Sequence, residues 1–175
     1  MESLLNLSEE KLLELERQFD KEFYLFSEKL INESLSKEEE LLQHQDFLKF
    51  VKVSYAPNPY LMKIVKQSKN FGAVCSEMTE LLIAEKAGFR ESEVMFFYEG
   101  FNDTALLYAN LRGFRLCVNS FENLIKAETH LGQLPYSVSL SKMQDTEIKK
   151  SFSYCALKGV ENIFINAEAP SLSET

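Results

Sequence analysis

The sequence contains no tryptophan, only four prolines, and six glycines of which no two are adjacent. Basic residues are also in the minority: 19 Lys and Arg stand against 27 Asp and Glu in 175 residues, a formal net charge of −8. This balance argues against binding to nucleic-acid phosphates or to an anionic membrane surface. No apolar run approaches the roughly 20 residues of a membrane-spanning helix. The acidic start, Met1–Lys11, lacks the basic and apolar regions of a secretory signal, so we expect one cytoplasmic domain.

Cysteine and histidine are sparse and widely spaced. Cys75, Cys117 and Cys155 have no metal-binding or redox spacing. His44 and His130 have no partner at the spacing of metal ligands. We therefore expect three reduced core cysteines and no bound metal.

The amino-terminal part has helical character. Ser8 can cap a first helix, because carboxylates follow it directly and apolar residues recur at helical spacing. We assign 1–22 to this helix and Phe23–Phe26 to a short strand. A second helical region covers about 28–48, and a capping box at Ser36 predicts that a new helix starts there.

The rest of the chain alternates short apolar strands with amphipathic helices. The predicted strands are Phe50–Tyr55, Ala73–Ser76, Val94–Tyr98, Phe114–Val118, Tyr136–Leu140 and Asn162–Ile165. The predicted helices are Tyr60–Ser68, Glu77–Ala87, Asp103–Leu111, Phe121–His130 and Asp145–Leu157. This alternation is typical of βα units with a parallel sheet, and either a doubly wound sheet or a (β/α) barrel satisfies it. A complete barrel has eight units in about 250 residues, whereas this chain has six, or seven with the short strand.

Small and polar residues follow the predicted strands. These residues, at the carboxyl ends of the predicted strands, are Ser54-Tyr55-Ala56, Ser76-Glu77, Glu99-Gly100, Asn119-Ser120, Ser141 and Asn166. Ligands bind at the carboxyl ends of parallel strands, so these residues are candidates for a binding rim. The same residue types also turn the chain and cap helices, so both interpretations stay open.

Five segments resemble, in order, the opening of the fold-type III pyridoxal-phosphate decarboxylases, the family of the diaminopimelate, ornithine and arginine enzymes. They are Gln18–Ile31 (QFDKEFYLFSEKLI), Val51–Pro59 (VKVSYAPNP), Phe71–Phe89 (FGAVCSEMTELLIAEKAGF), Glu91–Gly100 (ESEVMFFYEG) and Arg115–Glu122 (RLCVNSFE). The similarity is greatest to diaminopimelate decarboxylase. The resemblance implies an α/β fold: an incomplete (β/α) TIM-type barrel of about six to seven βα units, preceded by an N-terminal helix. The barrel-like domain would span 23–167, followed by a disordered tail at 168–175.

The departures from the family pattern concern its chemistry. The Schiff-base lysine of the family falls on Ser54, and a hydroxyl cannot form an imine with the cofactor aldehyde. Lys52, two positions earlier, would point to the same face of an extended strand, about 6–7 Å away, and is the alternative amine. The other positions that the resemblance assigns to the cofactor site are Glu77, Asn119 and Asn166.

The resemblance covers the first half of the family's barrel and not its glycine-rich phosphate loop. We therefore expect a truncated, degenerate and catalytically inactive relative without a cofactor, acting through self-association or contact with a related decarboxylase chain. One alternative is the N-terminal half of a pyridoxal-phosphate-dependent amino-acid decarboxylase that another chain completes. The other is a non-functional fragment.

Overall fold

The structure is a computed structural model that describes residues 8–19, 25–42, 49–135, 137–141 and 143–166. Two helices come first, α1 (Glu9–Gln18) and α2 (Glu28–Leu42). The Ser8 hydroxyl accepts a hydrogen bond from the Lys11 N–H at 3.3 Å, so the predicted cap of α1 is confirmed. The predicted tail at 168–175 and the last six residues of the predicted region 28–48 lie outside the described residues.

The helix start predicted at Ser36 is wrong, because α2 continues through this residue without a break. Both halves of α2 are tied to the chain around α3 (Pro59–Gln67). Near the start of α2, Glu28 accepts a hydrogen bond from Tyr60 Oη at 2.8 Å. Near its end, Glu39 accepts one from the Lys69 N–H at 3.0 Å. These two attachments favour one straight helix over a new start at an exposed serine.

The predicted strand at Phe23–Phe26 is not present in its described half. Leu25 and Phe26 lie in the irregular segment before α2, and the other two residues lie outside the described part of the chain. The described sheet therefore has six strands.

All six strands are parallel and follow one another in sequence order. They are β1 (Lys49–Lys52), β2 (Phe71–Cys75), β3 (Val94–Tyr98), β4 (Arg115–Val118), β5 (Ser137–Ser141) and β6 (Asn162–Asn166). The helices between them are α3, α4 (Met78–Ala87), α5 (Asp103–Leu111), α6 (Phe121–Leu131) and α7 (Asp145–Leu157). Two short 3-10 helices, η1 (Val53–Tyr55) and η2 (Glu91–Glu93), complete the described elements.

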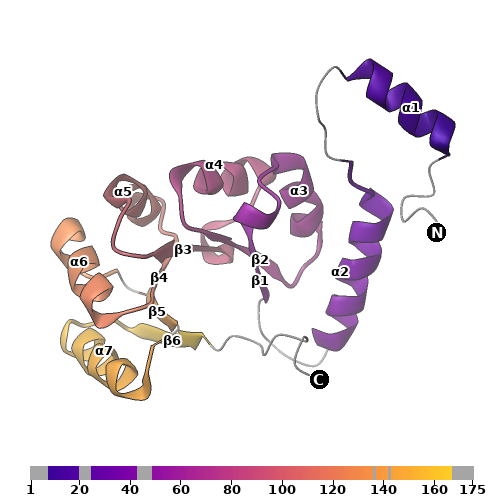
Figure 1. The fold of residues 1–175 in the computed structure, drawn as a ribbon. Coiled ribbons are helices and arrows are strands. Elements are labelled where there is room, and N and C mark those ends of the chain that lie inside the picture. Colours follow the sequence, from indigo (N-terminus) through magenta and orange to yellow (C-terminus); the bar gives the residue numbers. More distant parts are fainter. Residues whose placement is uncertain (1–7, 20–24, 43–48, 136, 142, 167–175) are drawn as a thin grey trace.

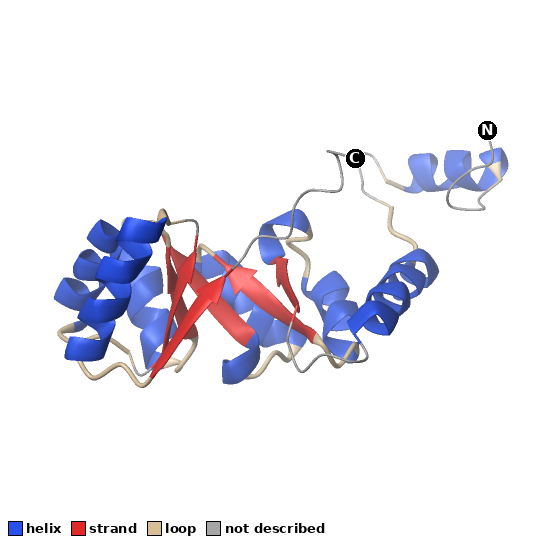
Figure 2. Ribbon diagram, turned by 90° about the horizontal axis from the view of Figure 1, so that it is seen from below, coloured by secondary structure: helices blue, strands red, loops and turns tan. Residues whose placement is uncertain are grey.

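The strand order distinguishes between the two architectures that the sequence allowed. A doubly wound sheet reverses its strand order at a switch point, whereas the order here is β1-β2-β3-β4-β5-β6 throughout. Figure 1 shows α3 to α7 as an arc outside the strands, and Figure 2 shows the strands as the inner layer. The fold is therefore an open arc of a (β/α) barrel, as predicted. Among the described strands, β1 and β6 each pair on one side only.

The strand register divides the sheet into a helix-facing side and a concave face. Helix-facing residues such as Phe71, Phe96 and Leu140 are at most 3% exposed and form the core with the apolar sides of α3 to α7. The alternate positions define the concave face. They are Phe50, Lys52, Gly72, Val74, Met95, Phe97, Arg115, Cys117, Ser137, Ser139, Ser141, Asn162 and Phe164.

Candidate functional site

The candidate rim lies at the carboxyl ends of the strands. Ser54 follows β1, Glu77 follows β2, Asn119 follows β4, and Asn166 is the last residue of β6. Because the strands are parallel, the topology places all four at the same edge of the sheet. The side chains of Ser54 and Glu77 are exposed, and that of Asn119 is half-buried.

Ser54 and Lys52 do not share an extended strand. Strand β1 ends at Lys52, and the next three residues form η1, in which the Ala56 N–H donates to the Val53 carbonyl at 3.0 Å. The expectation that alternation places both side chains on one strand face is therefore wrong. Val53 is fully buried, so its packing pulls the backbone inward at this turn. The Lys52 ammonium lies 5.8 Å from the ring centroid of Tyr55, a weak cation–π contact at an exposed site.

The polar residues after β4 form hydrogen bonds with the amino-terminal turn of α6. Ser120 Oγ accepts a hydrogen bond from the Asn123 N–H at 3.1 Å. Asn119 Oδ1 accepts one from Asn123 Nδ2 at 2.7 Å. The Phe121 N–H donates to Glu147 Oε1 at 2.8 Å. These contacts favour the helix-capping interpretation of Asn119 and Ser120 over a role in holding a ligand.

We expect Ser120→Ala to lower the free energy of unfolding by about 1 kcal/mol, because it removes the side-chain acceptor that caps α6. Ser120→Asp retains an acceptor and is expected to keep most of the stability. Urea unfolding followed by far-ultraviolet circular dichroism measures both variants. Equal losses in Ala and Asp would contradict a capping role.

The carboxylate of Glu80 serves the loop between β2 and α4. Its Oε2 accepts a hydrogen bond from the Ser76 N–H at 2.6 Å. The neighbouring Glu77 is the first residue before α4 and makes no side-chain cap hydrogen bond. Glu80 thus stabilises the loop between β2 and α4, whereas the side chain of Glu77 caps no helix N–H and could contact a ligand at the rim.

A hydrogen-bonded group that the sequence did not indicate links the buried Tyr98, on the helix-facing side of β3, to the more exposed Asp103 and His130. Tyr98 Oη donates to Asp103 Oδ1 at 2.6 Å, and His130 Nε2 lies 3.3 Å from Asp103 Oδ2. Burial, with Asp103 as hydrogen-bond acceptor, holds the pKa of Tyr98 well above its ordinary value. Tyr98 is only 1% exposed, and its phenol joins β3 to the first residue of α5.

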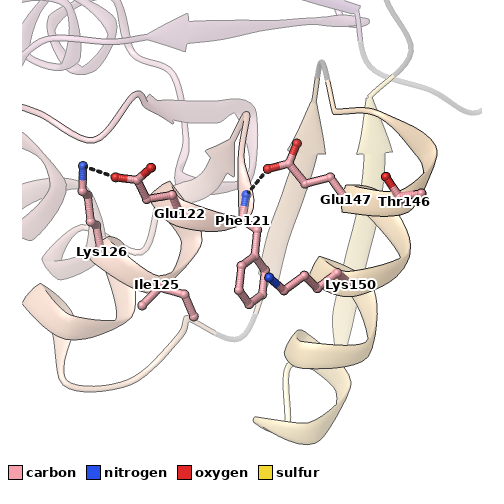
Figure 3. A pocket seen from close by; sticks show the side chains of 7 residues that line it. All are labelled: Phe121, Glu122, Ile125, Lys126, Thr146, Glu147 and Lys150. Carbon is pink, nitrogen blue, oxygen red and sulfur yellow. Dashed lines mark hydrogen bonds and ion pairs between the residues drawn. The ribbon is translucent and has the colours of Figure 1, made fainter.

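A hollow of about 630 Å³ lies between α6 and α7, outside the sheet (Figure 3). Its lining residues are Phe121, Glu122, Ile125, Lys126, Thr146, Glu147 and Lys150. The Lys150 ammonium lies 4.0 Å from the centroid of the Phe121 ring, and Lys126 Nζ lies 2.9 Å from Glu122 Oε1. None of the sequence-predicted site residues lines it. The hollow is lined by both basic and acidic side chains, and its two carboxylates, Glu122 and Glu147, already have partners. The lining therefore does not indicate a class of ligand.

The described part of the chain contains no group of three or more His, Cys, Asp or Glu side chains that could hold a metal ion. Within the same ranges, no helix combines the length and apolar character needed to cross a bilayer.

Comparison with known proteins places the fold among amino-acid decarboxylases. No protein-family model and no curated protein matches the chain. Solved structures match at TM-scores of 0.66 to 0.76. The fold of the chain is therefore that of one part of a decarboxylase barrel.

Three of these structures illustrate the likeness. Diaminopimelate decarboxylase from Helicobacter pylori, an I148L mutant complexed with L-lysine, has a TM-score of 0.76 at 18% identity, over 90% of this chain and 47% of that one. The arginine decarboxylase of Paramecium bursaria Chlorella virus, bound to agmatine, gives 0.72 at 18% over 94% and 48%. Ornithine decarboxylase from Entamoeba histolytica gives 0.66 at 17% over 90% and 49%.

These identities show a shared fold, and the structural neighbours are the decarboxylases that the sequence motifs resemble. The predicted relationship is thus confirmed at the level of fold. The chain spans about half the length of the structures that it matches.

Proposed function

We propose that this chain is a decarboxylase-like scaffold that is catalytically silent by itself and acts through contact with another protein. The open sheet carries this proposal. Among the described strands, β1 and β6 have no partner on their outer sides. Edge strand β6 exposes 41% of Phe164 and 60% of Ile165, which lie on opposite faces of the strand. An unpaired apolar edge is a template for pairing with another polypeptide.

The family that the chain resembles binds pyridoxal phosphate, but the residues at the rim of this chain do not suit that cofactor. The position of the family lysine is an exposed serine in a 3-10 turn, so the amine for a covalent link is missing there. Asn119 and Ser120 already hydrogen-bond to α6. The first N–H of this helix is taken by Glu147. These observations support a role in which the rim is structural.

The cytoplasm is the compartment that we propose. Cys75, Cys117 and Cys155 are buried and form no disulfide among the described residues, as expected of thiols in a reducing environment.

The expected partner is a second copy of the chain or a related decarboxylase chain that presents a complementary edge.

We expect the purified chain to self-associate or to bind diaminopimelate decarboxylase. Ile165→Lys should weaken this association at least about tenfold, because a charge on an edge strand opposes pairing. Leu111→Lys is the matched control: Leu111 is 81% exposed at the end of α5, which connects the interior strands β3 and β4, and should have no effect. Light scattering coupled to size exclusion measures the mass. A monodisperse monomer whose mass does not increase in the presence of the decarboxylase would refute the proposal.

A second candidate is a pyridoxal-phosphate enzyme half completed by another chain. One observation favours it: Lys52 lies on the concave face at the end of β1, and no carboxylate of the described residues forms an ion pair with it. This candidate requires that Lys52 replace the amine missing at Ser54.

Borohydride trapping separates the two candidates. The chain is incubated with pyridoxal phosphate, alone and with diaminopimelate decarboxylase, then reduced and mapped by peptide mass spectrometry. We expect no more label on Lys52 than on Lys63, an exposed lysine of α3. Selective labelling of Lys52 that Lys52→Arg abolishes would favour the enzyme half instead.

A further inference from the structure

The concave face carries positive charge without negative charge. Lys52 and Arg115 are the charged residues at its strand positions, and none of these positions is acidic. The chain as a whole has a net charge of −8, so this distribution is opposite to its composition. A face of this kind attracts anions.

Arg115 lies on this face at the amino end of β4, between aromatic rings from the two edge strands. It is the first residue of β4, and its guanidinium carbon lies 4.6 Å from the ring centroid of Phe164 on β6 and 5.7 Å from that of Phe50 on β1. The curved sheet thus brings residues from both of its edges against one guanidinium. The rings hold the planar group in place by cation–π contact and leave its N–H edge to bind a further group.

The charge of Arg115 has no counterion within the described residues. Arg115 is half-buried, and none of the ion pairs of the described carboxylates includes it. Burial lowers the pKa of Arg115 from its ordinary value, while the nearby thiol of Cys117 acts in the opposite direction. Arginine nevertheless stays charged in proteins, so a bound anion would stabilise this half-buried positive charge.

A second polar group without a partner lies on the neighbouring strand. Ser139 is fully buried, and its Oγ makes no hydrogen bond within the described structure. The register places Ser139 beside Cys117 of β4 and Phe164 of β6. The guanidinium of Arg115 lies over the ring of Phe164, which is one of these neighbours, and Cys117 follows Arg115 by two positions on the same face of β4. Arg115 and Ser139 are therefore diagonal neighbours on one face, and neither donor has a hydrogen-bond acceptor among the described residues.

We propose that Arg115 and Ser139 form a binding site for a small oxyanion, a carboxylate or phosphate group, on the concave face of the sheet. The forked N–H edge of the guanidinium suits two oxygens of one such group, and the hydroxyl of Ser139 supplies a third donor. Phe50 and Phe164 form the apolar walls. The site lies toward the amino ends of the strands, away from the rim that carries Ser54. It does not depend on the proposed protein contact.

Nuclear magnetic resonance of the arginine Nε–H signals tests this site in the full chain. The probes are inorganic phosphate and acetate, each compared with chloride at equal ionic strength. We expect the Arg115 signal to shift saturably with phosphate or acetate, and the signal of Arg112 to stay unchanged. Arg112 is an exposed arginine whose Nε lies 2.5 Å from Glu85 Oε1, so it serves as the internal control. No response of the Arg115 signal beyond that to chloride would overturn the proposal.

Variants make the test specific. We expect Arg115→Gln to weaken binding at least tenfold, Arg115→Lys to weaken it less because the charge remains, and Ser139→Ala to weaken it about threefold. Arg112→Gln should bind like the unchanged chain. If Arg115→Gln does not fold, the responses of Arg115→Lys and Ser139→Ala decide. Unchanged affinity in both of them would refute the site.

Discussion

We expect Glu93→Gln to lower the free energy of unfolding by about 3 kcal/mol at neutral pH. Glu93 is the last residue of η2, and only 8% of its side chain is exposed. Its carboxylate accepts hydrogen bonds from the Arg90 N–H at 2.8 Å and from Arg90 Nη2 at 2.6 Å. Lys66 Nζ lies 3.1 Å from it. A glutamine amide keeps the shape and one oxygen, but an N–H₂ group replaces the other oxygen, so the donors facing it lose their acceptor and Arg90 and Lys66 lose the opposite charge.

The same carboxylate makes stability depend on pH. Burial alone would raise the pKa of Glu93, but the hydrogen bonds from Arg90 and the ion pair with Lys66 outweigh it and lower the pKa to about 2. In the unfolded chain a glutamate titrates near pH 4.3. Because the folded state has the lower pKa, the stabilisation is fully present above about pH 4.3 and is lost as the pH falls toward 2.

Urea unfolding from pH 7 to pH 2 measures this effect. The difference in unfolding free energy between the unchanged chain and Glu93→Gln should shrink from about 3 kcal/mol toward zero over that range. Glu91→Gln is the matched control, since Glu91 lies in the same 3-10 helix but is exposed. It should change stability by less than about 0.5 kcal/mol. A difference for Glu93→Gln that does not vary with pH would show that lost packing, and not charge, causes the effect.

Much of the fold could be predicted because each βα unit has a recognisable local sequence pattern. The bounds of β3, α5 and α7 agree with the sequence prediction, because an apolar run and an amphipathic stretch fix them without reference to distant residues. β1 is shorter than predicted because the burial of Val53 and the turn at Ala56 end it, and these depend on tertiary packing. The unbroken α2 likewise depends on contacts with residues that lie 30 or more positions away.

The functional features divide in the same way. The prediction that Ser54 stands at the position of the family lysine could be made from the sequence, because it needs only the register of one motif. The diagonal placement of Arg115 and Ser139 on one face could not be predicted, since it depends on the pairing of β4 with β5 and on the curvature that brings Phe164 to the guanidinium. The contact of His130 with Asp103 joins two helices and leaves no local pattern either. Cross-strand and interhelical contacts carry the information that periodicity lacks.

We expect Gly100→Ala to lower the free energy of unfolding by about 2 kcal/mol. Gly100 lies in the loop between β3 and α5 with φ +86°, which costs an alanine about 1 kcal/mol. A Cβ at this position would also collide with Asn123 Oδ1. Asn123 is held there because its Nδ2 donates to Asn119 at 2.7 Å, and displacing it would break that bond at a further cost of about 1 kcal/mol.

Gly88→Ala separates the two costs of Gly100→Ala. Gly88 ends α4 with φ +91°, and a Cβ there would meet no atom within 4 Å, so only the backbone cost of about 1 kcal/mol applies. In Gly100→Ala/Asn123→Ala the collision disappears, so the double variant should be more stable than the sum of the single losses allows. Unfolding in urea measures Gly88→Ala, Gly100→Ala, Asn123→Ala and the double variant. Equal losses at Gly88 and Gly100 with additive effects at Asn123 would mean that the rim after β4 is not packed against the β3–α5 loop. Asn119 would then be available to a ligand, and the structural interpretation of the rim would fail.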